Sequence, residues 1–133
     1  MAGSRRIILD TVLVLSVLAT VLVYVVMVPR EIRAGGDPVA YFIGGWIPYT
    51  MAFYALGHRF GPADRLPSMR AADGGAILVV LSVLVSVAMA SWGFTPERVP
   101  EAHAIQALAV FVGLALFAWG IGQRSAAIES LSR

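Results

Sequence analysis

Four long stretches of the chain contain no Asp, Glu, Arg or Lys. Each has 18 or 19 residues, and they cover residues 11–28, 38–56, 74–92 and 104–122. A helix of this length is about 27–28 Å long, which matches the hydrocarbon core of a bilayer. Because lipid offers the backbone no hydrogen-bond partner, such stretches cross a membrane as α-helices. We therefore predict four transmembrane helices over these stretches, the first of which begins earlier and covers about 7–28.

These helices and their short connections use up the 133 residues, which predicts one transmembrane domain over 1–133. Composition agrees, since 59% of the residues are apolar and 14% are charged, whereas soluble domains have about 45–50% and about 25%. The expected fold class is all-α, a polytopic membrane protein whose four transmembrane helices form a bundle of two hairpins. Residues 57–73 would join the hairpins as a cytoplasmic loop, and residues 123–133 would form a short cytoplasmic tail.

The arginines are divided unequally between the two sides of such a bundle. Seven of the ten lie at the N-terminus, in the 57–73 loop and in the tail, whereas Arg30, Arg33 and Arg98 lie in the other two connections. Short loops rich in arginine and lysine stay in the cytoplasm. We therefore expect both termini in the cytoplasm and a multi-pass protein of the cell membrane, that is, the plasma membrane.

The two halves of the chain share a hydropathy pattern. A shift of 67 residues places the first apolar stretch on the third and the second on the fourth, while residue identity stays close to random. Two interpretations remain open: a tandem duplication of one hairpin, or the similarity that any small four-helix membrane protein shows between its halves.

The second apolar stretch differs from the others because it contains a proline near its middle. Pro48 cannot donate a hydrogen bond to the carbonyl of Gly44, and its ring crowds that turn, which predicts a kink. Two interpretations remain open: the kinked helix lines a small polar cavity or gate, or its polar side chains pack against Ser or Thr on adjacent helices. The candidate cavity or gate residues are Tyr41, Gly44, Gly45, Trp46, Pro48, Tyr49, Ser82 and Ser86.

Small and hydroxyl-bearing residues recur at helical spacing in the other three stretches. Such residues let helix backbones approach closely and form weak hydrogen bonds between helices. Besides the serines named above, the predicted helix-packing residues are Ser16, Thr20, Tyr24, Ala90, Ala109, Gly113 and Gly120.

The residues that usually carry chemistry are absent from the four stretches. None of them contains an ionisable acid, arginine or histidine, the groups that mark proton relays and ion paths in membranes. The chain has no cysteine, and His58 and His103 would lie on opposite sides of the membrane. His103 with Glu97 and Glu101 favours a solvated loop over a metal site. We predict no catalytic residues, no metal, no cofactor and no enzymatic activity.

These observations favour a protein that acts by association. We expect an accessory or assembly subunit of a membrane complex, or a homo-oligomer, with the lipid bilayer and other membrane subunits as its partners. No basic run of the kind that binds nucleic acid is present, so no nucleic acid is expected. The alternative is a small channel or carrier for a neutral or weakly polar solute, with its path beside the kinked second helix.

Overall fold

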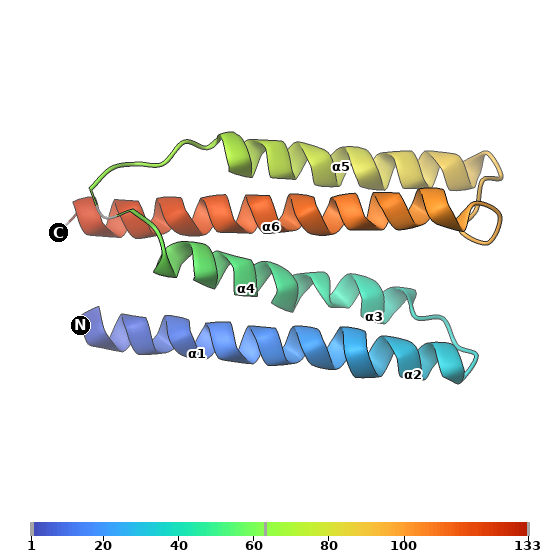
Figure 1. The fold of residues 1–133 in the computed structure, drawn as a ribbon, viewed down its shortest axis with the longest axis horizontal. Coiled ribbons are helices and arrows are strands. Elements are labelled where there is room, and N and C mark those ends of the chain that lie inside the picture. Colours follow the sequence, from blue (N-terminus) through green and yellow to red (C-terminus); the bar gives the residue numbers. More distant parts are fainter. Residues whose placement is uncertain (1, 63, 133) are drawn as a thin grey trace.

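The computed structural model describes residues 2–62 and 64–132, which are helical except for their connections. In chain order the elements are α1 (Ala2–Val21), the π-helical turn η1 (Leu22–Met27), α2 (Val28–Arg33), α3 (Val39–Gly44), α4 (Trp46–Arg59), α5 (Arg70–Ser91) and α6 (Pro100–Leu131). They form four helical rods, because α1, η1 and α2 run on as one helix and α4 continues α3 (Figure 1). All four are long and apolar enough to cross a membrane.

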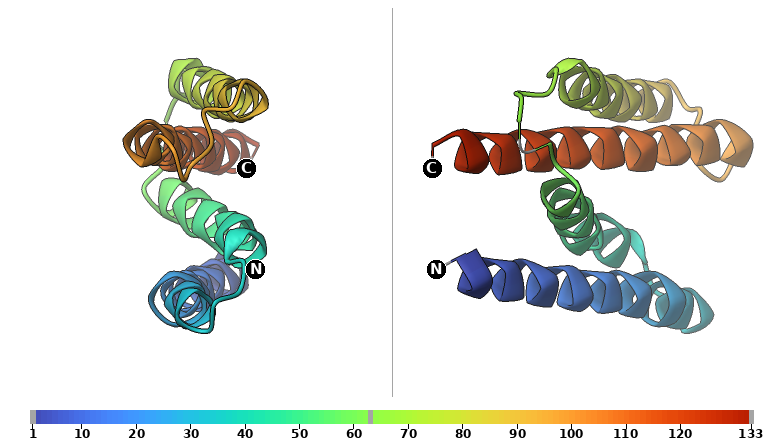
Figure 2. Two further views of the ribbon diagram at one scale, coloured as in Figure 1. Left: turned by 90° about the vertical axis from the view of Figure 1, so that its right-hand side faces the viewer. Right: turned by 60° about the vertical axis from the view of Figure 1, so that its left-hand side comes forward.

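The four rods lie side by side in a single layer. Along the layer the order is α5, α6, α4 with α3, and then α1 with η1 and α2 (Figures 1 and 2). The rods of each hairpin are antiparallel, whereas α4 and α6, which meet between the two hairpins, run in the same direction (Figure 1). Both ends of the chain lie at one end of the layer, where α4 connects to α5, and the other two connections lie at the opposite end (Figure 1).

This arrangement corrects the expected bundle. The two hairpins exist, but they continue one another in a row instead of closing around a shared core. The physical reason is that lipid covers an apolar helix face as well as protein does, so no hydrophobic force closes the layer. The helices at the two edges, α1 and α5, each pack along one neighbouring rod only.

Two helices continue beyond their predicted limits. The expected loop over 57–73 is shorter, because α4 ends at Arg59 and α5 begins at Arg70. The expected tail over 123–133 is helical as far as Leu131, so α6 has 32 residues. Apolar length shows where a helix lies in lipid, but a helix also continues into water where its residues favour it. Ala126 and Ala127 are such residues, and both are buried.

The contacts between the rods depend on small side chains. Among the described residues, no large side chain is fully buried, and the buried apolar residues other than Val110 are alanines. Between α5 and α6 the backbones meet directly, because a Cβ added at Gly75 would overlap the Gly113 carbonyl oxygen. Between α4 and α6, a Cβ added at Gly57 would overlap the carbonyl of Trp119. Close backbone approach therefore holds the layer together on both sides of α6.

The second rod is interrupted at Gly45, between α3 and α4. The sequence predicts this interruption from Pro48, three residues later. The π-helical turn η1 of the neighbouring rod packs against α3, beside the interruption. Irregular helical geometry therefore occurs on both sides of this contact.

Candidate functional site

One predicted cavity residue of the second rod, Tyr49, belongs to a cluster of aromatic side chains. The ring of Phe111, on α6, lies 5.0 Å from the ring of Tyr49 and 5.4 Å from the ring of Tyr24. Phe42 completes the cluster, with its ring centroid 5.6 Å from that of Phe111. Three of the four rods, all except α5, therefore meet through aromatic edges at this point.

Both tyrosine hydroxyls of the cluster are satisfied by backbone carbonyls. Tyr24 donates to the Phe42 oxygen over 2.6 Å, and Tyr49 donates to the Phe111 oxygen over 2.8 Å. For Tyr49, one of the two open interpretations was packing against Ser or Thr on an adjacent helix, whereas the structure pairs its hydroxyl with a backbone carbonyl of the adjacent helix α6. The first bond links η1 to α3 of the second rod, and the second bond links α4 of that rod to α6.

Five further candidates for the cavity lie on the same rod as Tyr49. Gly45 is buried beneath Tyr24, and an added Cβ would lie 2.6 Å from the tip of the Tyr24 ring. Pro48 is half-buried, while Gly44 and Tyr41 are exposed on the outside of the layer. The indole nitrogen of Trp46 is buried and has no hydrogen-bond partner within the described residues.

The two serine candidates lie elsewhere. Ser82 and Ser86 are on α5, and α6 lies between α5 and the second rod (Figure 1). The Ser86 hydroxyl bonds to Nδ1 of His103 over 2.9 Å, and Nε2 of that ring donates to the carbonyl of Phe94 over 2.8 Å. The structure therefore does not bring Ser82 and Ser86 to Tyr49, and His103 ties the α5–α6 connection in place.

The predicted packing residues divide into those that contact a neighbour and those that do not. Gly113 and Gly120 are buried against α5, where a Cβ on Gly120 would lie 2.9 Å from that of Ala72. Ser16 is buried, and its carbonyl accepts the Thr20 hydroxyl over 2.7 Å, while Tyr24 belongs to the aromatic cluster. Ala109 is half-buried and Ala90 is exposed.

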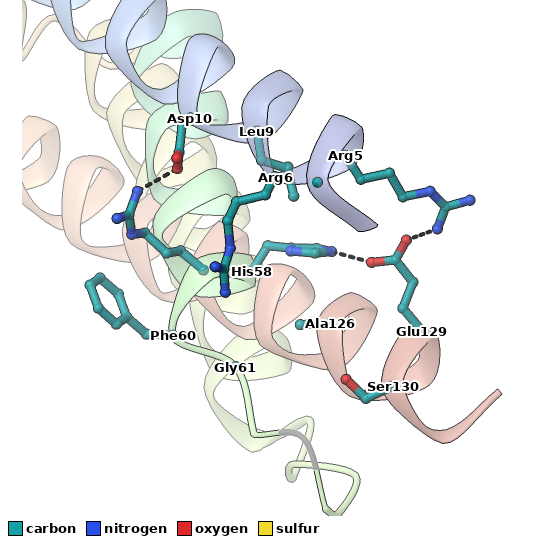
Figure 3. A pocket seen from close by; sticks show the side chains of 12 residues that line it. Arg5, Arg6, Leu9, Asp10, His58, Phe60, Gly61, Ala126, Glu129 and Ser130 are labelled. Carbon is teal, nitrogen blue, oxygen red and sulfur yellow. Dashed lines mark hydrogen bonds and ion pairs between the residues drawn. The ribbon is translucent and has the colours of Figure 1, made fainter. Parts of the chain in front are cut away.

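A second group of polar residues surrounds a pocket at the end of the layer that carries both termini. The first and last rods of the chain extend further at this end than α4, which lies between them (Figure 1). The resulting hollow, which we call the terminal pocket, has a volume of about 610 Å³. Its charged and histidine lining residues are Arg5, Arg6, Asp10, His58, Arg59 and Glu129 (Figure 3).

Two ion pairs and one histidine hydrogen bond cross the terminal pocket between different rods. Arg59 of α4 pairs with Asp10 of α1, and Arg5 of α1 pairs with Glu129 of α6 (Figure 3). The Glu129 carboxylate also bonds to Nε2 of His58 over 2.8 Å. These contacts connect α1 directly to α6, which otherwise lies on the far side of α4.

Glu129 is the centre of this network. It lies in the last turns of α6, seven residues beyond the last apolar stretch. Partial desolvation by itself would raise the pKa of its carboxyl, but the His58 hydrogen bond and the Arg5 charge outweigh that effect. The pKa of Glu129 therefore lies below its ordinary value, and the group is an anion at neutral pH.

The sequence interpretation missed this group. It used Arg5, Arg6 and Arg59 only for the membrane orientation, it considered His58 only as a metal ligand, and it gave Glu129 no role. The sequence did contain one indication of the group. All of these residues come shortly before or after an apolar stretch, at the end of the stretches that also holds both termini. What the sequence lacks is the length of α6 beyond the apolar stretch, which carries Glu129 to α1.

Metal ligation finds no support in this geometry. Within residues 2–62 and 64–132, no three His, Cys, Asp or Glu side chains are grouped so that they could hold a metal ion. His58 and His103 lie at opposite ends of the layer and have separate partners.

No protein-family model, no curated protein and no solved structure matches this chain.

Proposed function

We propose that this protein acts by lateral association in the cell membrane, as a homo-oligomer or as an accessory subunit of a membrane complex. The observation that carries the proposal is the single layer of helices. Such a layer leaves the edge helices α1 and α5 with a neighbour on one side only. Other transmembrane helices are the natural partners for these edges, because helices in lipid associate through close packing.

One residue on the α5 edge has no explanation within the chain. Gly74 is exposed in a helix, and a Cβ added there would meet no atom within 4 Å. Glycine in a helix is less favourable than alanine by about 1 kcal/mol. A second helix approaching α5 at this point would make use of the missing side chain, as small residues do at membrane helix interfaces.

Purification from the native membrane in mild detergent tests the proposal. We expect the protein to be recovered as a homo-oligomer, or together with another subunit in fixed stoichiometry, by native mass spectrometry. Gly74→Leu should reduce this association severalfold. The matched control is Ala90→Leu, which adds a similar side chain at an exposed position on another side of the same helix. Recovery of the wild-type chain as a monomer without partners would contradict the proposal.

The channel alternative is less well supported. A single layer has no interior for a solute to cross, so a path would need several copies around an axis. The hydroxyl of Tyr49, which was expected to line such a path, already bonds to the carbonyl of Phe111. Solute flux through liposomes that contain only this protein would favour the channel over the accessory subunit.

We propose further that the end of the layer with both termini faces the cytoplasm, because seven of the ten arginines belong to that end. The chain has no cysteine, so single cysteines can be introduced without removing any. Glu97→Cys should react with a membrane-impermeant maleimide in intact cells, and Ser68→Cys should not. Labelling of the Ser68→Cys variant alone would reverse the orientation.

A further inference from the structure

We propose that the terminal pocket binds the phosphate of an anionic phospholipid headgroup. The proposal concerns a ligand of the bilayer and does not depend on which protein partners the chain has. It rests on the charge of the pocket, on the hydrogen-bond donors that its arginines retain, and on its position beside the apolar stretches.

The terminal pocket is lined by more arginines than carboxylates. Each carboxylate is engaged, since Asp10 accepts from Arg59 and Glu129 accepts from both Arg5 and His58. Arg6 also lines the pocket, and within the described part of the chain it has no ion pair. One guanidinium is therefore left over for an anion from outside, even when His58 is neutral.

The paired arginines also have donors to spare. A guanidinium has five N–H groups in a planar fork that fits two oxygens of a phosphate. Arg5 and Arg59 each use Nη1 for their ion pairs, and their side chains are 63% and 51% exposed. The N–H groups that the ion pairs leave free therefore add to the donors of Arg6 along the pocket, and an anion can use them without breaking an ion pair.

The terminal pocket is at the depth of lipid headgroups. Asp10 directly precedes the apolar stretch 11–28, and His58 lies two residues after the stretch 38–56. Ile7 and Phe60 flank the charged residues in the sequence and are 68% and 62% exposed, which provides apolar surface for the start of an acyl chain. The volume of about 610 Å³ falls within the range of about 300–1,000 Å³ usual for ligand sites. Basic pockets between transmembrane helices at this level recognise lipid headgroups.

Native mass spectrometry of the intact protein in detergent, with added lipid, tests the proposal. Wild-type protein should bind phosphatidylglycerol more tightly than phosphatidylcholine, which has a phosphate but no net charge. Arg6→Ala should weaken phosphatidylglycerol binding about fivefold, the effect of one basic residue near a membrane surface. Arg6→Lys should keep most of the affinity. Because Arg6 is exposed and unpaired among the described residues, its replacement should leave the fold and the oligomeric state unchanged.

The matched control is Arg70→Ala, which removes the same charge at the start of α5, away from the terminal pocket. It should change phosphatidylglycerol binding less than twofold. Equal losses in both variants, or no preference for phosphatidylglycerol in the wild type, would overturn the proposal and leave the arginines as a general surface charge or an internal ion-pair network. Displacement of the lipid by inorganic phosphate at similar concentration would show that a free anion, not a lipid, is the ligand.

Discussion

The two hairpins of the layer are held together in different ways. Between α5 and α6 the backbones touch through Gly75, Gly113 and Gly120, with no aromatic ring at the contact points. Between α1 and the second rod the contact runs through the Tyr24 ring, its hydroxyl bond to Phe42 and the surface ion pair of Arg59. One hairpin is joined by close backbone approach and the other by specific side-chain contacts around an interrupted helix.

The difference shows two ways in which neighbouring helices can pack against each other in lipid. Where two regular helices lie side by side, glycines at the contact let the backbones touch over a long distance, and this contact has favourable dispersion energy. Where the second rod is interrupted at Gly45, the regular surface needed for such a contact is lost. A tyrosine from the neighbouring rod then fills the space and satisfies a carbonyl near the interruption. We expect the α5–α6 hairpin to be sensitive to added bulk, and the hairpin of α1 and α4 to be sensitive to the loss of polar contacts.

The largest effect is expected for added bulk in the α5–α6 contact. Gly75→Leu would place a side chain where the Gly113 carbonyl lies, and overpacking of this kind lowers the free energy of unfolding by about 3 kcal/mol. Unfolding with SDS in mixed micelles measures the loss. Ala90→Leu is the control, because it adds the same side chain at an exposed position of the same helix. Similar losses for the two variants would mean that α5 does not pack on α6 through Gly75.

A smaller effect is expected in the other hairpin. Tyr24→Phe removes the bond to the Phe42 carbonyl and should lower the free energy of unfolding by about 1 kcal/mol, the usual value in membranes. Gly45→Ala should cost a similar amount, because its Cβ would displace the tip of the Tyr24 ring.

The double variant sharpens this expectation. When Tyr24→Phe and Gly45→Ala are combined, displacing the ring no longer breaks a hydrogen bond. The double variant should therefore lose less free energy of unfolding than the sum of the two single losses. The same SDS titration measures the coupling, and Gly44→Ala, with open space around its Cβ, is the neutral control. Strict additivity would show that Gly45 and Tyr24 act independently.

The smallest effect is expected at the ion pair that joins the ends of this hairpin. The side chains of Arg59 and Asp10 are 51% and 43% exposed, and exposed ion pairs contribute less than about 1 kcal/mol. Arg59→Gln should therefore change the free energy of unfolding less than Tyr24→Phe does, and Arg70→Gln should change it less still. A larger loss for Arg59→Gln would show that the terminal pocket, not the aromatic cluster, holds α1 in place.

Several local features followed from the sequence. The four apolar stretches identified four long helices, and Pro48 indicated an interruption in the second of them, which lies at Gly45. Gly113 and Gly120 were selected as packing residues, and both meet α5 closely. These predictions depend on neighbours within one helix, or on the absence of water in the bilayer, and such effects are encoded locally.

The partners of the helices did not follow from the sequence. Ser82 and Ser86 share the polar character of Tyr49, but only the tertiary structure places α6 between them. Nor could the sequence show that α6 continues to Leu131 and brings Glu129 to Arg5 and His58. The order of helices across the layer has no local signal, because every apolar face is compatible with lipid and with any other helix. The sequence alone determined which segments form long helices that are apolar enough to cross a membrane, and only the tertiary structure decided which of them touch.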